Sequence, residues 1–229
     1  MYFDPYYLFL VVPAFLLSVI AQIMVKSTYN RMSKVMNSRG ITGAAAAAAV
    51  LRHYGIYDVK IEQTHGKLTD HYDPRSNVIR LSDGVYNSTS VAAVGIAAHE
   101  AGHAAQHAQN YAPIRVRNSI LPVCRIGSFI GIPLALFGYY LAFEPLILIG
   151  LALYSAIAIF QLATLPVELN ASNRAIAVIN ETGLLGEDES KSATKVLRAA
   201  AMTYVASLAV TLANLLRFVM IFLGGRRRN

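Results

Sequence analysis

Ala97-Ala98-His99-Glu100-Ala101-Gly102-His103-Ala104-Ala105-Gln106-His107 carries an H-E-x-x-H pattern inside an alanine-rich run. On a helix, residues four apart lie on one face, about 5 to 6 Å apart at Cβ, so His99 and His103 can both reach one zinc ion. Glu100, at the next position, can act as a general base without binding the metal. The pattern predicts a helix over about 89–109, with His99 and His103 as zinc ligands and Glu100 as the catalytic residue.

The residues around this motif distinguish a buried metal site from a solvated surface helix. Between Val91 and Ala108 the only ionisable side chains are those of the motif and His107. A solvated helix face normally carries pairs of lysine and glutamate, and this segment contains no lysine. Because buried imidazoles and carboxylates need partners, the segment favours a zinc site.

The composition is too apolar for a soluble domain of this length. Of 229 residues, 55% are hydrophobic and 14% are charged, and the mean hydropathy is +0.44. Four windows of 20, 18, 21 and 18 residues contain no charge: Tyr6–Val25, Ile126–Phe143, Pro145–Leu165 and Ala199–Leu216. Each is long enough to cross about 30 Å of hydrocarbon as a helix, so we predict four transmembrane helices rather than four buried helices of a soluble protein.

The first window could instead be a cleaved signal peptide. The residues before it, Met1 to Pro5, lack the positive charge that a signal peptide needs, and the window is longer than the apolar region of a signal, which predicts an uncleaved anchor.

Cys124 is the only cysteine, so no disulfide can form within the chain. The pI of 9.6 and net charge of +7 come from basic residues beside the apolar windows, which favours the lipid bilayer and its anionic headgroups over nucleic acid as the partner.

A small sheet is expected between the first window and the motif. An alanine run with Thr42 as its cap and Gly55 as its stop predicts a helix over about 43–54. Alternation over 57–62 predicts a strand, and the segments 68–72 and 77–81 flank a turn with a proline, which indicates a hairpin or a three-stranded sheet. An edge strand there either holds an extended substrate or only completes the core.

A catalytic zinc usually has a third protein ligand. His107 lies one further turn along the helix, about 6 Å from His103, so it is not the expected ligand. The expected third ligand is Glu168, because this carboxylate closely follows the third apolar window and lies in an apolar segment. The alternatives are a Glu168 that is exposed or paired with Arg174, and a ligand from the sheet region: His65, Asp70, His71 or Asp73.

Several segments together resemble a known family. They are Leu68-Thr69-Asp70-His71-Tyr72-Asp73-Pro74-Arg75, Leu81-Ser82-Asp83-Gly84-Val85-Tyr86, Ala98-His99-Glu100-Ala101-Gly102-His103-Ala104 and Leu165-Pro166-Val167-Glu168. The combination is similar to the YugP-type membrane zinc metallopeptidases of bacteria over nearly the whole chain. The resemblance implies a neutral zinc metallopeptidase with one Zn²⁺ per chain, held by His99, His103 and Glu168. The related HtpX-type enzymes carry an aspartate four residues after the ligand glutamate, where this chain has Ser172.

The expected fold is a mainly α-helical membrane protein with about four transmembrane helices and a small α+β zincin-like catalytic domain. We expect five parts: an N-terminal anchor (1–25), the catalytic domain with the H-E-x-x-H helix (26–118), a transmembrane hairpin (119–165), a segment with the third ligand (166–198), and a C-terminal transmembrane helix with a basic tail (199–229).

The expected function is a membrane-integral zinc metalloendopeptidase in which Glu100 takes a proton from zinc-activated water. Its substrates would be membrane or membrane-associated proteins or peptides, and the sequence does not indicate an oligomeric state. Arg174, His107 and Tyr86 are candidate donors to the oxyanion. The alternatives are a site-2-type intramembrane protease, with the motif in a spanning helix, and a non-catalytic zinc-binding adaptor, in which Glu100 has no task.

The basic residues also predict an orientation for this multi-pass protein in the cell membrane. Nine lie near window ends on the side of the motif: Lys26, Arg31, Lys34, Arg39, Arg115, Arg117, Arg174, Lys195 and Arg198. Three, Arg226 to Arg228, lie on the other side. The excess predicts a cytoplasmic active site. Because four complete spans would carry those three arginines across, the last window alternatively re-enters the membrane or lies at its surface.

Overall fold

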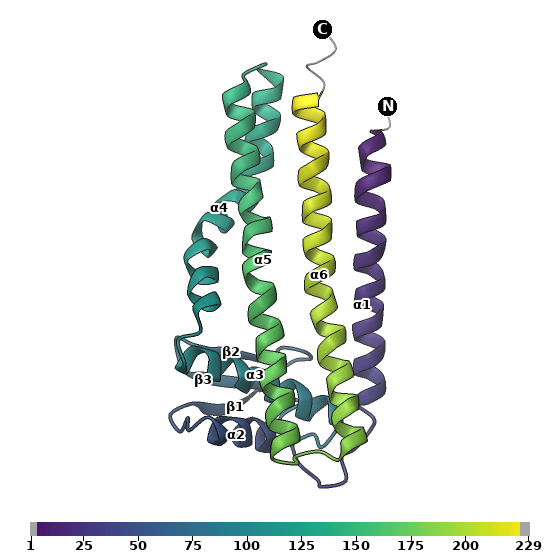
Figure 1. Ribbon diagram of the computed structural model, residues 1–229, viewed down its shortest axis with the longest axis vertical. Coiled ribbons are helices and arrows are strands. Elements are labelled where there is room, and N and C mark those ends of the chain that lie inside the picture. The colour runs from purple at the N-terminus through teal and green to yellow at the C-terminus, as the bar shows by residue number, and fades with distance from the viewer. Residues whose placement is uncertain (1–3, 225–229) are drawn as a thin grey trace. The chain divides into compact units, whose positions relative to one another are not determined.

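A computed structural model describes residues 4–224 of the chain (Figure 1). A short π-helical segment, η1 (Tyr7–Val11), is followed by α1 (Val12–Met32), α2 (Gly43–His53), β1 (Lys60–Thr64), β2 (His71–Asp73), β3 (Val78–Ser82), α3 (Val91–Ala108), α4 (Ala112–Tyr140), α5 (Glu144–Glu181) and α6 (Glu187–Gly224). Four helical segments are long and apolar enough to cross a membrane: Tyr7–Met32, Ala112–Tyr140, Glu144–Glu181 and Glu187–Phe222. The predicted mainly helical class with a small sheet and four candidate spans is confirmed.

The chain divides into two compact units, which we call the span unit and the motif unit. The span unit comprises residues 1–22, 115–165 and 202–229, of which the structure describes 4–22, 115–165 and 202–224. The motif unit comprises residues 23–114 and 166–201. Helices α1, α5 and α6 each contribute to both units, and Figure 1 shows α5 and α6 as unbroken helices.

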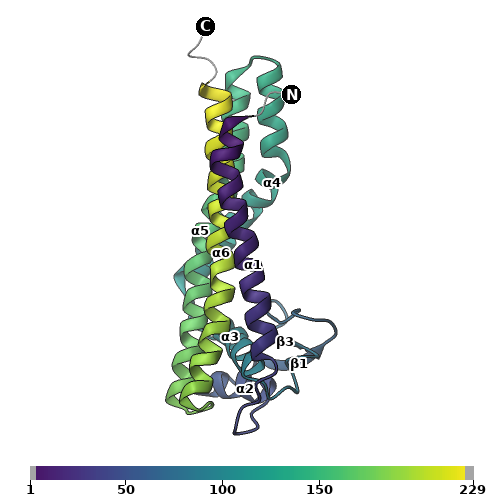
Figure 2. The ribbon, with the colours of Figure 1, turned by 90° about the vertical axis from the view of Figure 1, so that its right-hand side faces the viewer.

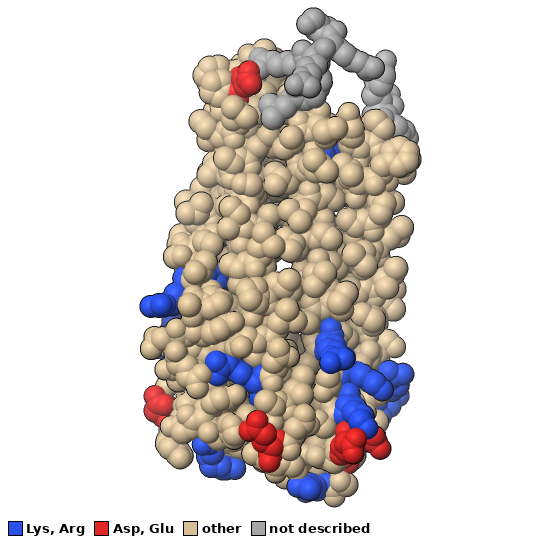
Figure 3. Space-filling model, viewed as in Figure 1, with Lys and Arg blue, Asp and Glu red and all other residues tan. Residues whose placement is uncertain are grey.

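The candidate spans expose most of their apolar surface. Only 11% to 28% of the most apolar window of each is buried, whereas helices in the core of a soluble protein would be covered. Large side chains such as Phe9, Phe129 and Tyr140 are 75% to 84% exposed. Figure 3 shows a wide area of the surface without charged residues. The burial therefore favours helices surrounded by lipid over the buried helices of a soluble protein.

Glycines allow α4 and α5 to approach closely within the span unit. A Cβ added to Gly127 would lie 2.0 Å from the carbonyl oxygen of Leu153, and one added to Gly150 would lie 2.5 Å from the backbone nitrogen of Ala135. No side chain fits at either position without a backbone shift. Such close approaches through small residues are typical of helix pairs in membranes.

The last apolar window lies inside one continuous helix. Helix α6 has 38 residues and no internal break, so residues 199–216 do not turn back as a re-entrant segment would. Arg217 of this helix forms an ion pair with Asp4, and its guanidinium lies over the ring of Tyr7. The basic tail, Arg226 to Arg228, lies outside the described residues.

The motif unit is built from a three-stranded mixed sheet and two capped helices. The strand order is β1-β3-β2, with β1 parallel and β2 antiparallel to β3, so β2 is an edge strand. At the start of α2, the Thr42 hydroxyl accepts a hydrogen bond from the Ala45 N–H. At the start of α3, the Ser90 hydroxyl accepts one from the Ala93 N–H. Figures 1 and 2 both show α2, α3 and the sheet side by side.

All three strands begin later than the sequence predicts. Leu68 has φ = 57° and Asn77 has φ = 55°, left-handed backbone that cannot continue a strand, so β2 begins at His71 and β3 at Val78. The first strand, expected over 57–62, lies at Lys60–Thr64. The predicted helices over 43–54 and 89–109 are present with ends shifted by one or two residues.

Candidate metal centre

The structure brings together three of the sequence-predicted site residues. His99 and His103 come from α3 and Glu168 from α5, and one ligand atom of each lies within 4.8 Å of the others. Gly102 allows this approach, because a Cβ at this position would lie 2.6 Å from the carbonyl oxygen of Ala171. The glycine inside the motif therefore lets α5 come close enough for Glu168 to face the histidine pair.

The spacing of these groups fits a zinc ion. Glu168 Oε2 lies 3.4 Å from His99 Nε2 and 3.5 Å from His103 Nε2. Tetrahedral zinc with bonds of about 2.0 to 2.1 Å places its ligand atoms about 3.4 Å apart. Two imidazoles and one carboxylate are also the donor set of many catalytic zinc sites, which keep one position open.

The three side chains are largely covered by the protein but keep some exposed surface. His99 and His103 expose 16% and 17% of their side chains, and Glu168 exposes 9%. Alanines of α3 around the motif, such as Ala98 and Ala101, are fully buried. The candidate centre is thus enclosed by the protein but open to water or to a bound chain.

A buried hydrogen-bond network determines which nitrogen of His103 carries a proton. Arg174 can only donate, so the Asn170 atom that it contacts is the acceptor Oδ1. This oxygen also accepts a hydrogen bond from Gln106 Nε2. Gln106 Nε2 donates a second hydrogen bond, to the carbonyl oxygen of Val167. Gln106 therefore presents Oε1 to His103, 3.0 Å from Nδ1. Since Oε1 can only accept, Nδ1 is protonated, and Nε2 keeps its lone pair for a metal.

His99 has a different second contact. Its Nδ1 lies 3.1 Å from the hydroxyl of Ser172, which follows Glu168 by four residues and so lies on the same face of α5. Ser172 stands at the position where, as noted from the sequence, the related HtpX-type enzymes carry an aspartate. A hydroxyl can orient the ring, but it adds no negative charge.

The electrostatics of the centre favour a bound cation. Burial lowers the pKa of His103, but the hydrogen bond to Glu168 and the negative charges of Glu100 and Glu168 outweigh burial, and the pKa lies above its ordinary value. The same negative charges would favour zinc. Proton and metal compete for this site, because a ligating histidine must be neutral.

Glu100 lies beside the centre and is held by the sheet. Its Oε2 accepts a hydrogen bond of 3.0 Å from the backbone N–H of Tyr72 in β2. In an antiparallel pair, a residue whose N–H points away from its partner strand also points its carbonyl away. Tyr72 therefore uses the free edge of β2 to contact Glu100 without losing a ladder hydrogen bond.

The other candidates from the sequence lie outside this group of three. Among residues 4–224, His65 contacts Asp83, Asp70 contacts Ser82, His71 contacts the Thr69 carbonyl, Asp73 contacts Ser76, and the exposed His107 has its ring against Tyr72. The Ser76 hydroxyl and the Arg75 N–H lower the pKa of Asp73 to about 2, so this carboxylate stays ionised and closes the turn after β2. The five therefore have partners of their own.

Arg174, a candidate oxyanion donor, does not pair with Glu168. Its guanidinium donates to Asn170 and Gln109 and lies over the rings of Tyr54 and Tyr111. Tyr86, another candidate, packs against the core of the motif unit. No sequence pattern pointed to Gln106 or Asn170, because their roles depend on contacts between segments more than 60 residues apart.

Comparison with known proteins gives two matches. The family model described as "putative neutral zinc metallopeptidase" matches residues 7–223. The protein named "Putative membrane protease YugP" from Bacillus subtilis (strain 168) is 47% identical over 223 residues, which cover 97% of this chain and 99% of the relative. No solved structure matches the chain.

Proposed function

Because the chain belongs to the family described as "putative neutral zinc metallopeptidase", we propose that it is a membrane-integral zinc endopeptidase. His99, His103 and Glu168 bind one zinc ion, and Glu100 is the general base. The observation that carries this proposal is the fit of three donor atoms to zinc, with Glu100 held beside them by Tyr72.

The chain's own groups supply the proton transfers. When bound, zinc supplies Lewis acidity, which makes water more acidic and polarises a peptide carbonyl. Glu100 accepts the proton as water attacks the carbonyl carbon, and the same carboxylate then delivers it to the leaving amine. The Tyr72 N–H holds one oxygen of Glu100, so that the other can face the reacting atoms.

The edge strand β2 is the proposed place for substrate. An extended peptide can pair with the outward carbonyl of Tyr72 by strand addition, which requires no particular side chain. Helices α1, α4, α5 and α6 carry the candidate spans that flank the motif unit in sequence. We therefore propose membrane or membrane-associated proteins as substrates.

The proposed active site faces the cytoplasm. Nine basic residues near span ends belong to the side of the motif, against three in the C-terminal tail. Such a bias holds short segments on the cytoplasmic side. The alternative of a site-2-type intramembrane protease is disfavoured, because α3 (Val91–Ala108) is not among the four candidate spans within the described residues.

The test combines metal analysis with a protease assay on the full chain in detergent. We expect about one zinc per chain in the wild type and in His107→Ala, and loss of zinc in Glu168→Ala. Glu100→Gln should keep zinc and lose at least about 100-fold in peptide cleavage, because it removes the base but no ligand. Glu62→Gln, which alters an exposed glutamate of β1, serves as the control and should change neither.

Any of three outcomes would contradict the proposal. Zinc that remains in Glu168→Ala would place the third ligand elsewhere. Full cleavage by Glu100→Gln would exclude Glu100 as the base, whereas a zinc-loaded wild type without any cleavage would favour the adaptor.

A further inference from the structure

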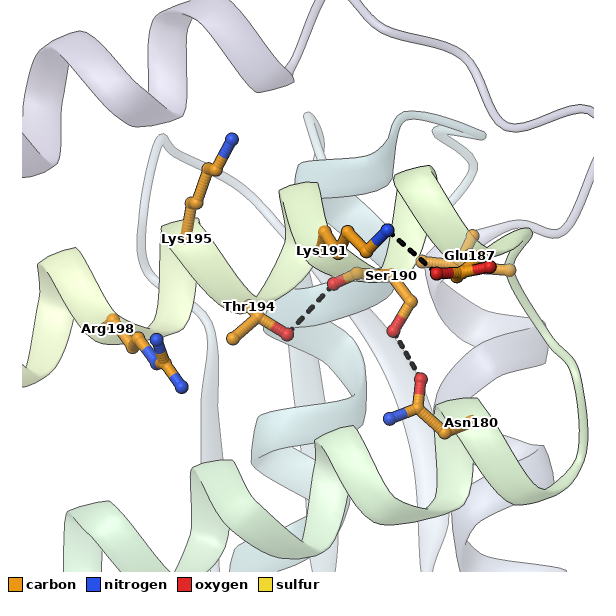
Figure 4. Close-up of a pocket in the computed structure, with 8 residues that line it drawn as sticks. Asn180, Glu187, Ser190, Lys191, Thr194, Lys195 and Arg198 are labelled. Atoms are coloured by element: carbon orange, nitrogen blue, oxygen red, sulfur yellow. Dashed lines mark hydrogen bonds and ion pairs between the residues drawn. The ribbon is translucent and has the colours of Figure 1, made fainter.

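A pocket lies between the end of α5 and the start of α6 in the motif unit. Its volume is about 700 Å³. The residues that line it are Asn180, Leu185, Glu187, Ser190, Lys191, Thr194, Lys195 and Arg198, seven of which are labelled in Figure 4. None of them belongs to the candidate metal centre, so the pocket needs its own explanation.

The charges along this pocket are not balanced. Lys191 forms ion pairs with Glu187 and Asp188, at 2.8 and 3.2 Å. Lys195 and Arg198 are exposed, and no ion pair to either is present within residues 4–224. The pocket therefore offers two cations without an acidic partner at one end and a neutralised lysine at the other.

Neutral polar groups lie between these charges. Thr194 donates its hydroxyl hydrogen to the Ser190 carbonyl, and the Ser190 hydroxyl donates to Asn180 Oδ1. Figure 4 shows Lys195 and Arg198 on the same side of Thr194 along α6, with Lys195 extending from one face of the helix and Arg198 from another, and with the Asn180 amide nitrogen pointing away from Ser190. Both long side chains can rotate toward a ligand over Thr194, and the amide is a further donor.

The position of these cations along α6 indicates what they meet. Arg198 directly precedes the charge-free window Ala199–Leu216, and Lys195 lies three residues before Arg198. At a rise of about 1.5 Å per residue, Lys195 is about 4.5 Å from Arg198 along the helix axis. When the window crosses the hydrocarbon, both cations lie at the level of the lipid phosphates.

We propose that this pocket binds the headgroup of an anionic phospholipid, with its phosphate held by Lys195 and Arg198 and its polar end beside Thr194 and Asn180. Basic pockets at the ends of membrane helices suit such headgroups. A zwitterionic headgroup fits less well, because its own cation would face Lys195 and Arg198. The site is independent of zinc and of proteolysis.

The test is lipid binding by the full-length protein in neutral detergent, measured by native mass spectrometry. Phosphatidylglycerol and phosphatidylcholine with the same acyl chains are the probes, and glycerol phosphate is the soluble competitor. We expect the wild type to prefer phosphatidylglycerol, and the double variant Lys195→Gln/Arg198→Gln to lose at least about fivefold in affinity for it. Displacement by glycerol phosphate alone at equal concentration would identify a soluble phosphate ester as the ligand and overturn the lipid assignment.

The matched control removes the same two charges beside another span. Arg31→Gln/Lys34→Gln alters exposed residues near the end of α1 that do not line the pocket, and it should keep the preference within about twofold. An equal loss in both double variants would mean a general charge effect and overturn the site. Unchanged binding in Lys195→Gln/Arg198→Gln, with zinc content as in the wild type to show that it is folded, would also overturn it.

Discussion

Gln106 connects a candidate ligand to a second helix. Its side chain is fully buried, accepts from His103 and donates to both Val167 and Asn170 of α5. A glutamine satisfied at both ends has one orientation, so it fixes the His103 tautomer as well as the ring position. Hydrogen-bond partners of metal ligands matter to affinity for this reason.

Replacing Gln106 by leucine tests this role. Gln106→Leu keeps the side chain's approximate size but removes both hydrogen-bonding ends, so we expect zinc affinity to fall about 10- to 100-fold. The affinity would be measured by competition with a chelator. Gln63→Leu, at a glutamine that contacts Asp83 outside the centre, is the control. An unchanged affinity in folded Gln106→Leu would show that the contact does not orient the ligand.

The sequence revealed most directly those candidate site residues whose chemistry is local. His99, Glu100 and His103 lie on one helical turn, so their spacing alone predicts their meeting. Glu168 required an added inference, that a carboxylate in an apolar segment needs a partner. The contact between Glu100 and Tyr72 joins residues 28 apart and uses a backbone donor, so no side-chain pattern predicts it.

At the scale of elements, the short strand β2 has a role beyond completing the sheet. It has three residues, it is an edge strand, and its central residue contacts the proposed base. Its existence was predictable from the proline-containing turn sequence that follows it. The residue at which β2 begins was not predictable, because the left-handed backbone of Leu68 depends on how the loop before β2 closes. In this loop the Thr69 hydroxyl donates a hydrogen bond to the His65 carbonyl.

Proline at position 72 removes the one N–H that holds Glu100. The Tyr72 N–H points away from β3, so Tyr72→Pro leaves the ladder intact, and proline is tolerated on such an edge. We expect at least about a tenfold loss of kcat in peptide cleavage with zinc content unchanged. The control Tyr72→Phe keeps the N–H and loses only the hydroxyl contact to Asn77. Equal activity of the two variants would exclude the backbone contact from catalysis.

At the scale of the whole molecule, α5 carries both a candidate span and a candidate metal ligand. It runs from Glu144 to Glu181 and continues through Pro166, two residues before Glu168. The four apolar windows were visible in the sequence because length and hydropathy suffice to identify them. The sequence did not show that α5 and α6 continue as helices beyond these windows, since helix ends depend on packing.

Cysteine labelling tests the proposed topology. In a Cys124→Ser background, Lys67→Cys places a thiol on an exposed loop of the motif unit, and Phe143→Cys places one between α4 and α5. We expect a membrane-impermeant maleimide to label Phe143→Cys in intact cells and Lys67→Cys only after permeabilisation. The reverse pattern would place the active site outside the cytoplasm, and labelling of both in intact cells would contradict a complete α4 or α5 span.

The backbone contact to Glu100 also affects how this family can diverge. Any amino acid except proline supplies the N–H that Tyr72 donates. Selection on the contact therefore acts on the path of the chain rather than on the identity of the residue. A different side chain at this position would change the surface beside Glu100 and leave the hydrogen bond that holds Glu100 in place.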